Sequence, residues 1–186
     1  APGSQGYLLQ PTPGTLNGES VSGFVKDTKF SVKRGHYDSA ITVAISTETE
    51  GASIRYTTNG SSPSDSIGTL YTGPITLNET TVLRAIAFKE GFQPTNIDTQ
   101  TYLFAADIKN QSEMDRDIVT DPEYASTIED DLSGNLPIMS LVLDEALFFG
   151  PNGTHTNYER SGRGAEIPVS VEFFNPLDPT SKFQTL

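Results

Sequence analysis

Between residues 30 and 104 the chain alternates short apolar runs with clusters of turn-forming residues. The runs are rich in Val, Ile, Thr, Tyr and Phe, and they are separated by Gly, Pro, Asn, Ser and Asp. In residues 41–46, for example, Ile41, Val43 and Ile45 share one face of an extended chain, because successive side chains of a strand point to opposite faces. This pattern predicts a mainly β chain whose central unit is an antiparallel β-sandwich.

Residues 81–88 form the longest predicted strand. Apolar side chains lie on both of its faces, with Leu83, Ala85 and Ala87 on one and Val82, Ile86 and Phe88 on the other. A two-sided run of this kind is typical of a central strand that has one face in the core and the other partly covered. We expect residues 70–71 to be a short edge strand and residues 99–104 to be the closing strand.

The alternation ends after residue 105, and residues 106–135 become strongly acidic, with Lys109 and Arg116 as their only basic residues. Asp121 before Pro122 has the signature of a helix N-cap followed by the first helical position. We expect one or two short helices here, with an acidic face exposed to solvent.

A second β-rich stretch follows this connector. Residues 136–143 read as a strand of buried type, residues 169–174 alternate as another strand, and residues 182–186 stand where a partner strand belongs. The predicted organisation has four segments. They are a lead-in or linker at 1–28 that ends a preceding domain, the β-sandwich at 29–105, a short acidic helical connector at 106–135, and a partial second β unit at 136–186.

Charge and composition narrow the classes of partner. The formal net charge is −12, so the chain offers no basic surface to a nucleic acid backbone or an anionic membrane. No apolar run approaches the ~20 residues of a transmembrane helix, and we predict no membrane insertion. The absence of cysteine excludes disulfides, thiolate zinc sites and cysteine nucleophiles.

The sequence contains no arrangement of residues that indicates catalysis. The two histidines, His36 and His155, lie far apart, and the nucleophile-elbow, P-loop and HExxH motifs are absent. We therefore expect a chain that is not an enzyme and needs no cofactor.

Several short motifs of the central unit occur in the order found in one family of domains. They are GASIRYTTNG at 51–60, Pro63, YTGPI at 71–75 and TVLRAIAF at 81–88. Residues 30–104 thereby resemble the immunoglobulin-like domain at the C-terminus of chitobiases and β-hexosaminidases, although Asn59-Gly60 stands where Asp-Gly is common. The resemblance implies a non-catalytic accessory domain of secreted, polysaccharide-related or cell-surface proteins.

The flanking segments carry two further resemblances. Residues 136–176, LPIMSLVLDEALFFGPNGTHTNYERSGRGAEIPVSVEFFNP, are similar to the start of the region named for spore-coat CotH proteins. Some members of that family are atypical protein kinases, but their nucleotide and metal residues lie further downstream, so the activity is not carried over. Residues 7–18, YLLQPTPGTLNG, are similar to the closing motif of a lamin-tail-like domain. The three resemblances together imply a piece of a larger secreted or cell-surface bacterial protein.

Two kinds of ligand site are conceivable within residues 30–104. Tyr37, Tyr71 and Phe92 are candidates for stacking on sugar rings, although the chain has no Trp, the ring best suited to that role. The alternative is that these rings pack under loops or against the edge of the sandwich. Asn59 and Asp65 are candidate Ca²⁺ ligands, but hard cations usually require more than one carboxylate, and Asp65 is the only charged residue of that loop.

Two hypotheses about function remain open. The chain is either an accessory β-sandwich module of a large extracellular protein that contacts polysaccharide, or a protomer of an extracellular assembly or filament completed by strand exchange between copies. Strands left unpaired would favour the assembly, whereas an exposed Tyr and Phe row would favour sugar binding. We also expect the isolated chain to be oligomeric or partly disordered after residue 104.

Overall fold

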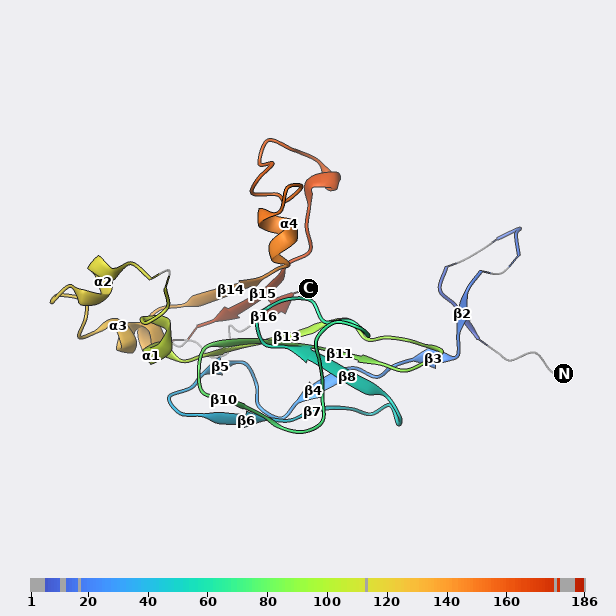
Figure 1. The fold of residues 1–186 in the computed structure, drawn as a ribbon, viewed down its shortest axis with the longest axis horizontal. Helices are drawn as coiled ribbons and strands as arrows, with labels where there is room; N and C mark the ends of the chain where they lie inside the picture. The colour runs from blue at the N-terminus through green and yellow to red at the C-terminus, as the bar shows by residue number, and fades with distance from the viewer. Residues whose placement is uncertain are drawn as a thin grey trace.

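The computed structural model describes residues 6–10, 13–16, 18–112, 114–175, 177 and 183–185. Figure 1 shows a central β-sandwich, a helical connector at one end, an N-terminal hairpin at the other, and a second small sheet across the sandwich. The fold is mainly β, with an antiparallel β-sandwich as its largest unit, as the sequence predicts. No helix in the described part of the chain is long and apolar enough to span a bilayer.

The larger layer of the sandwich is a five-stranded sheet with the order β5-β13-β11-β8-β9. Its strands are β5 (Gly35–His36), β13 (Asp98–Leu103), β11 (Thr81–Phe88), β8 (Ser53–Thr57) and β9 (Thr69–Leu70). β11 is central and antiparallel to both neighbours, while β5 joins β13 in parallel. The predicted central strand, edge strand and closing strand are therefore confirmed, with shifts of about one residue at their ends.

The facing layer consists of two strand pairs. β4 (Thr28–Phe30) pairs with β7 (Ile45–Thr47), and β6 (Ile41–Val43) pairs with β10 (Ile75–Leu77). The single strand predicted at 41–46 is thus wrong, because the chain changes partner at Ala44. The Ser31 hydroxyl accepts from the Ala44 amide at 2.8 Å and the Tyr71 hydroxyl accepts from the Ile45 amide at 3.0 Å, which satisfies both donors at the break.

The hydrophobic core lies between these two layers. Alternate residues of β11 (Leu83, Ala85 and Ala87) meet Val43 and Ile45 from the facing layer, and all five are buried. The opposite face of β11 carries the buried Arg84 among partly buried residues, so the prediction of one face in the core and the other partly covered is correct.

The N-terminal segment forms small strand pairs. β1 (Tyr7–Leu8) and β2 (Ser20–Val21) make a hairpin, and β3 (Gly23–Phe24) pairs in parallel with β12 (Phe92–Gln93). Residues 1–5, 11, 12 and 17 of the predicted lead-in lie outside the described residues.

The acidic connector contains short helices, as predicted. They are α1 (Ala105–Ile108), α2 (Arg116–Thr120), α3 (Ile128–Asp130) and a π-helical turn at Asp131–Asn135. The N-cap predicted at Asp121 is only partly correct. The Asp121 carboxylate accepts from the Glu123 amide at 2.7 Å, but single turns follow it and the next helix begins at Ile128. Of these helical residues only Ala105 is buried, so little packing stabilises a longer helix.

The C-terminal stretch forms a three-stranded antiparallel sheet with the order β14-β15-β16. Its strands are β14 (Ile138–Val142), β15 (Ser170–Phe174) and β16 (Phe183–Thr185), and α4 (Glu145–Phe149) and a 3₁₀ turn (Arg163–Ala165) lie between the first two. The strand predicted at 136–143 is present as β14, but it is less buried than expected, because Met139 and Leu141 are more than half exposed. Only the opposite face packs against the sandwich, over β13 (Figure 1).

Candidate functional site at the junction of the two sheets

Glu172 lies at the centre of the contact between the second sheet and the sandwich. Alternation along β15 directs Ser170, Glu172 and Phe174 inward, and their exposed fractions are 3%, 0% and 2%. Phe174 meets the His36 ring of β5 edge-on, with ring centroids 6.1 Å apart. A carboxylate at such a position requires partners, because burial of an unpaired charge is very costly.

The sandwich supplies these partners. Arg34 forms an ion pair with Glu172, with Nη1 3.0 Å from Oε1. The Thr101 amide donates to Oε1 at 3.3 Å, and the Thr101 hydroxyl donates to Oε2. Because that hydroxyl has a single proton, Ser140 of β14 donates to Thr101 Oγ1 at 2.8 Å. The network therefore joins β13, β14 and β15.

Burial dominates the electrostatics of this carboxylate. It raises the pKa of Glu172 above the ordinary glutamate value, whereas the Thr101 hydrogen bonds and Arg34 act in the opposite direction. The same environment leaves no solvent-exposed surface on Glu172, so its chemistry is that of a structural contact.

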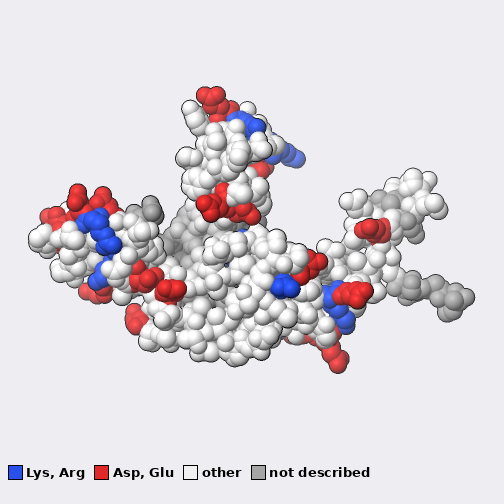
Figure 2. Space-filling model, viewed as in Figure 1, with Lys and Arg blue, Asp and Glu red and all other residues white. Residues whose placement is uncertain are grey.

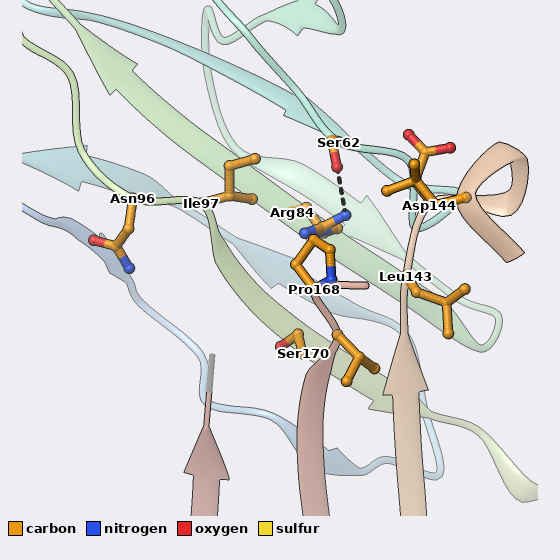
Figure 3. A pocket seen from close by; sticks show the side chains of 10 residues that line it. Ser62, Arg84, Asn96, Ile97, Leu143, Asp144, Pro168 and Ser170 are labelled. Atoms are coloured by element: carbon orange, nitrogen blue, oxygen red, sulfur yellow. Dashed lines mark hydrogen bonds between the residues drawn. The ribbon is translucent and has the colours of Figure 1, made fainter. Parts of the chain in front are cut away.

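A pocket of about 230 Å³ opens beside this contact. Figure 3 shows Arg84 at the centre of this pocket. Around it lie the loop after β8, the segment before β13, the C-terminal end of β14 and the N-terminal end of β15. The lining combines polar and apolar side chains: Ser62, Arg84, Asn96, Ile97, Leu143, Asp144, Leu147, Pro168, Val169 and Ser170.

Arg84 is 8% exposed, yet its charge is incompletely matched. Its Nη1 donates to the Gly60 carbonyl and to Ser62 Oγ, both at 3.0 Å, but the buried Nε has no acceptor. No carboxylate in the described ranges lies within ion-pair distance of it. Burial lowers the pKa of Arg84, and the more distant Asp144 partly opposes this shift.

The three aromatic rings predicted to stack on sugars pack against the core instead of forming a row. Tyr37 lies beside Tyr102 and Phe104, its hydroxyl donates to the Lys33 carbonyl, and burial raises the pKa of Tyr37. These contacts occupy much of the ring, so the packing alternative describes Tyr37 well.

Tyr71 and Phe92 lie among other neighbours. The Tyr71 ring meets Tyr56 edge-on at 6.3 Å, and its hydroxyl holds the Ile45 amide. The Phe92 ring lies close to Gly23, and the Lys89 ammonium is 4.9 Å from its centroid. All three predicted rings keep a partly exposed edge, so sugar contact stays a prediction.

The two predicted Ca²⁺ ligands, Asn59 and Asp65, form hydrogen bonds within their own region of the sandwich, and a calcium site there stays a prediction. The Asn59 carboxamide oxygen accepts from the amide and hydroxyl of Ser61, and the Asp65 carbonyl accepts from Arg55 Nε at 2.9 Å. Among the residues described, no group of three His, Asp or Glu side chains is arranged to hold a metal ion.

Sequence reasoning missed Arg34, Arg84 and Glu172 as site residues. The sequence feature that could have indicated two of them is a charged residue within an apolar strand. Glu172 alternates with Ser170 and Phe174, and Arg84 lies between Leu83 and Ala85. Such a charge on an inward face requires a partner or a ligand.

Comparison with known proteins finds a similarity for one part of the chain. Residues 32–112 match the family model of the chitobiase/beta-hexosaminidase C-terminal domain. The matched segment, called the chitobiase-type domain below, contains Arg34, Arg84 and Thr101, and the immunoglobulin-like fold of that family agrees with the sandwich described above. Domains of this type are associated with carbohydrate-active proteins.

The match does not extend to Glu172, and the resemblances at 7–18 and 136–176 stay predictions. No curated protein and no solved structure matches the chain.

Proposed function

We propose that this chain is a non-catalytic accessory module of a large secreted or cell-surface bacterial protein, and that it fixes the orientation of the segment following its chitobiase-type domain. The observation that carries this proposal is the buried Glu172, which takes hydrogen bonds from Thr101 and an ion pair from Arg34. A contact of this kind between two sheets favours one fixed arrangement over a flexible tether.

A non-catalytic role is supported by where the charges lie. Figure 2 shows the acidic side chains of this face gathered over the helical connector, around α4 and at the end of the sandwich near the N-terminal hairpin, while the middle of the sandwich carries few. Glu172, the carboxylate at the centre of the junction, is inaccessible to a substrate. An extracellular location and contact with polysaccharide are supported by the family of the chitobiase-type domain.

Small-angle X-ray scattering of the isolated chain tests the rigid junction. We expect the wild-type curve to fit one arrangement of sandwich and second sheet. The double variant Thr101→Val with Glu172→Leu tests whether this arrangement of the two sheets is maintained by the polar network or by apolar packing. Scattering from wild-type protein that requires many arrangements of the two sheets would contradict the proposal.

The proposed absence of catalysis needs a separate assay. Chromogenic glycosides incubated with the purified chain are expected to release no product above a buffer blank. A polysaccharide pull-down with Tyr37→Ala and Tyr71→Ala then tests the proposed sugar contacts, since binding retained in both variants would reject these rings.

A second candidate role is a protomer of an extracellular assembly. β14 lies at an edge of its sheet, and Met139 and Leu141 expose an apolar outer face there, 55% and 58% accessible. Against strand completion by a neighbour, β15 already pairs with β16 of the same chain. Light scattering over a range of protein concentrations decides this candidate, because assembly requires a mass that rises with concentration.

A further inference from the structure

The pocket around Arg84 is built from both sheets and is therefore a product of their junction. Ser62, Arg84 and Ile97 come from the chitobiase-type domain, whereas Asp144, Pro168 and Ser170 come from the C-terminal segment. Figure 3 shows these side chains around one opening. Its volume of about 230 Å³ lies somewhat below the usual range for ligand pockets, so any occupant is small or is one unit of a chain.

Two buried polar groups on the wall of this pocket lack partners. Arg84 Nε has no acceptor, and Ser170 Oγ has no hydrogen-bond partner, although Ser170 is only 3% exposed. Buried polar groups in native proteins are almost always hydrogen-bonded. Two exceptions on one small cavity indicate a place where a ligand supplies the missing contacts.

The edge of the Arg84 guanidinium that has no hydrogen-bond acceptor indicates that the ligand is negatively charged. With Nη1 engaged by Gly60 and Ser62, the edge formed by Nε and Nη2 is the fork that binds a carboxylate with two parallel hydrogen bonds. Asp144 lines the same pocket and repels a group with two negative charges more strongly than a group with one. A single carboxylate fits this combination better than a phosphate.

The other side chains that line the pocket indicate to what kind of molecule the carboxylate is attached. Ser62, Ser170, Asn96 and Asp144 offer hydroxyl, amide and carboxylate groups that exchange hydrogen bonds with hydroxyls. Ile97, Leu143, Pro168 and Val169 supply an apolar wall. Rings that carry hydroxyls on their edges and C–H groups on their faces match both features.

We propose that this pocket binds a sugar acid, with the carboxylate of a hexuronate on Arg84 and its hydroxyls on Ser170 and Asp144. The ligand is a free hexuronate or a terminal uronate of a polysaccharide. This binding does not depend on the accessory role, because a rigid junction can exist without a ligand and scattering measures it separately.

Nuclear magnetic resonance titration of the full chain with glucuronate and galacturonate tests the proposal. Amide shifts should concentrate at Ser62, Asp144 and Ser170 and saturate with ligand. Glucose and galactose test the need for the carboxylate, acetate tests the need for the ring, and inorganic phosphate tests the class of anion. An oligouronate compared with the free sugar distinguishes the two sources.

Two variants with matched controls connect the shifts to the pocket. Arg84→Lys keeps the charge but loses the fork, so binding should weaken about tenfold or more. Arg55→Lys on the neighbouring strand is its control, because Arg55 binds the Asp65 and Gly68 carbonyls away from the pocket. Ser170→Ala should weaken binding about fivefold without lowering stability, since it removes an unpartnered hydroxyl. Ser46→Ala, an exposed strand serine, is its control.

Several outcomes would overturn the proposal. They are the absence of saturable shifts with both uronates, equal binding of neutral sugars or acetate, tighter binding of phosphate, and shifts confined to residues outside the pocket. If Arg84→Lys fails to fold, unchanged uronate affinity in folded Ser170→Ala also counts against it.

Discussion

At the scale of single residues, Glu172 shows how a buried charge can serve as a junction. Its partners Arg34 and Thr101 belong to the other sheet, so the cost of burying the carboxylate is offset only while the two sheets stay in contact. Because burial outweighs these favourable contacts, the pKa of Glu172 is raised, so the folded state binds a proton at this side chain more tightly than the unfolded chain does.

The pH dependence of stability follows from that raised pKa. Glu172 contributes most to stability below its ordinary pKa, and this contribution falls as the pH rises toward the folded-state pKa. Urea denaturation of wild type and Glu172→Gln from about pH 4 to about pH 8 isolates this effect, because the other carboxylates cancel in the difference. We expect the wild type to lose stability relative to the variant as the pH rises. A relative gain would mean that Arg34 outweighs burial.

Tyr71 is predicted to act through its hydroxyl. Tyr71→Phe leaves the Ile45 amide without its acceptor at the point where the strand changes partner, and should lower the free energy of unfolding by about 1–3 kcal/mol. Thermal or chemical denaturation measures the loss. Tyr158→Phe is the control, because Tyr158 is 80% exposed and should change stability by less than about 0.5 kcal/mol. Equal effects in both variants would contradict this role.

At the scale of elements, the alternation of apolar and polar residues predicts those strands whose position depends on their own side chains. Residues 81–88 form β11 as the alternation indicates, because one face of the strand packs into the core and the other is partly buried. The break at Ala44 was not predictable, since the acceptors that stabilise it come from Ser31 and Tyr71. Likewise, Thr101 and Glu172 meet across 71 residues, and no periodicity contains that pairing.

The edge strand β9 depends on the backbone of Gly68. Its φ is +97°, and a Cβ there would lie 2.7 Å from the Tyr56 carbonyl oxygen. Gly68→Ala should therefore cost about 1–3 kcal/mol and increase hydrogen exchange in β9. Gly73→Ala is the control, because no atom lies within 4 Å of its added Cβ. Unchanged exchange in Gly68→Ala would show that the edge tolerates the displacement.

At the scale of the whole molecule, the structure is three stacked layers with peripheral charge (Figures 1 and 2). The third layer belongs to the segment beyond the family match, so its docking could not be predicted from the resemblance. The pocket around Arg84 could not be predicted for the same reason, because more than half of its lining residues belong to that C-terminal segment.

The second sheet should stay bound to the sandwich after the connector between them is cut. Cleavage at a specific protease site inserted after Ala125, an exposed turn residue, should leave the two fragments associated through Glu172 and the packed sheets. Size-exclusion chromatography of the cleaved protein measures this. Co-elution is expected for the wild type, and weaker association for Glu172→Ala, which leaves Arg34 without its counter-ion. Separation of the wild-type fragments would mean that the connector holds the sheets together.

The position of β13 has a consequence for biosynthesis. It is the last strand of the five-stranded sheet along the chain, yet it lies between β5 and β11. The ribosome must therefore release residues 98–103 before the earlier strands can close into one sheet, and pairing over such sequence separations is slow. Chains arrested before Asp98 should remain sensitive to protease, with the edges of β5 and β11 open to other nascent chains.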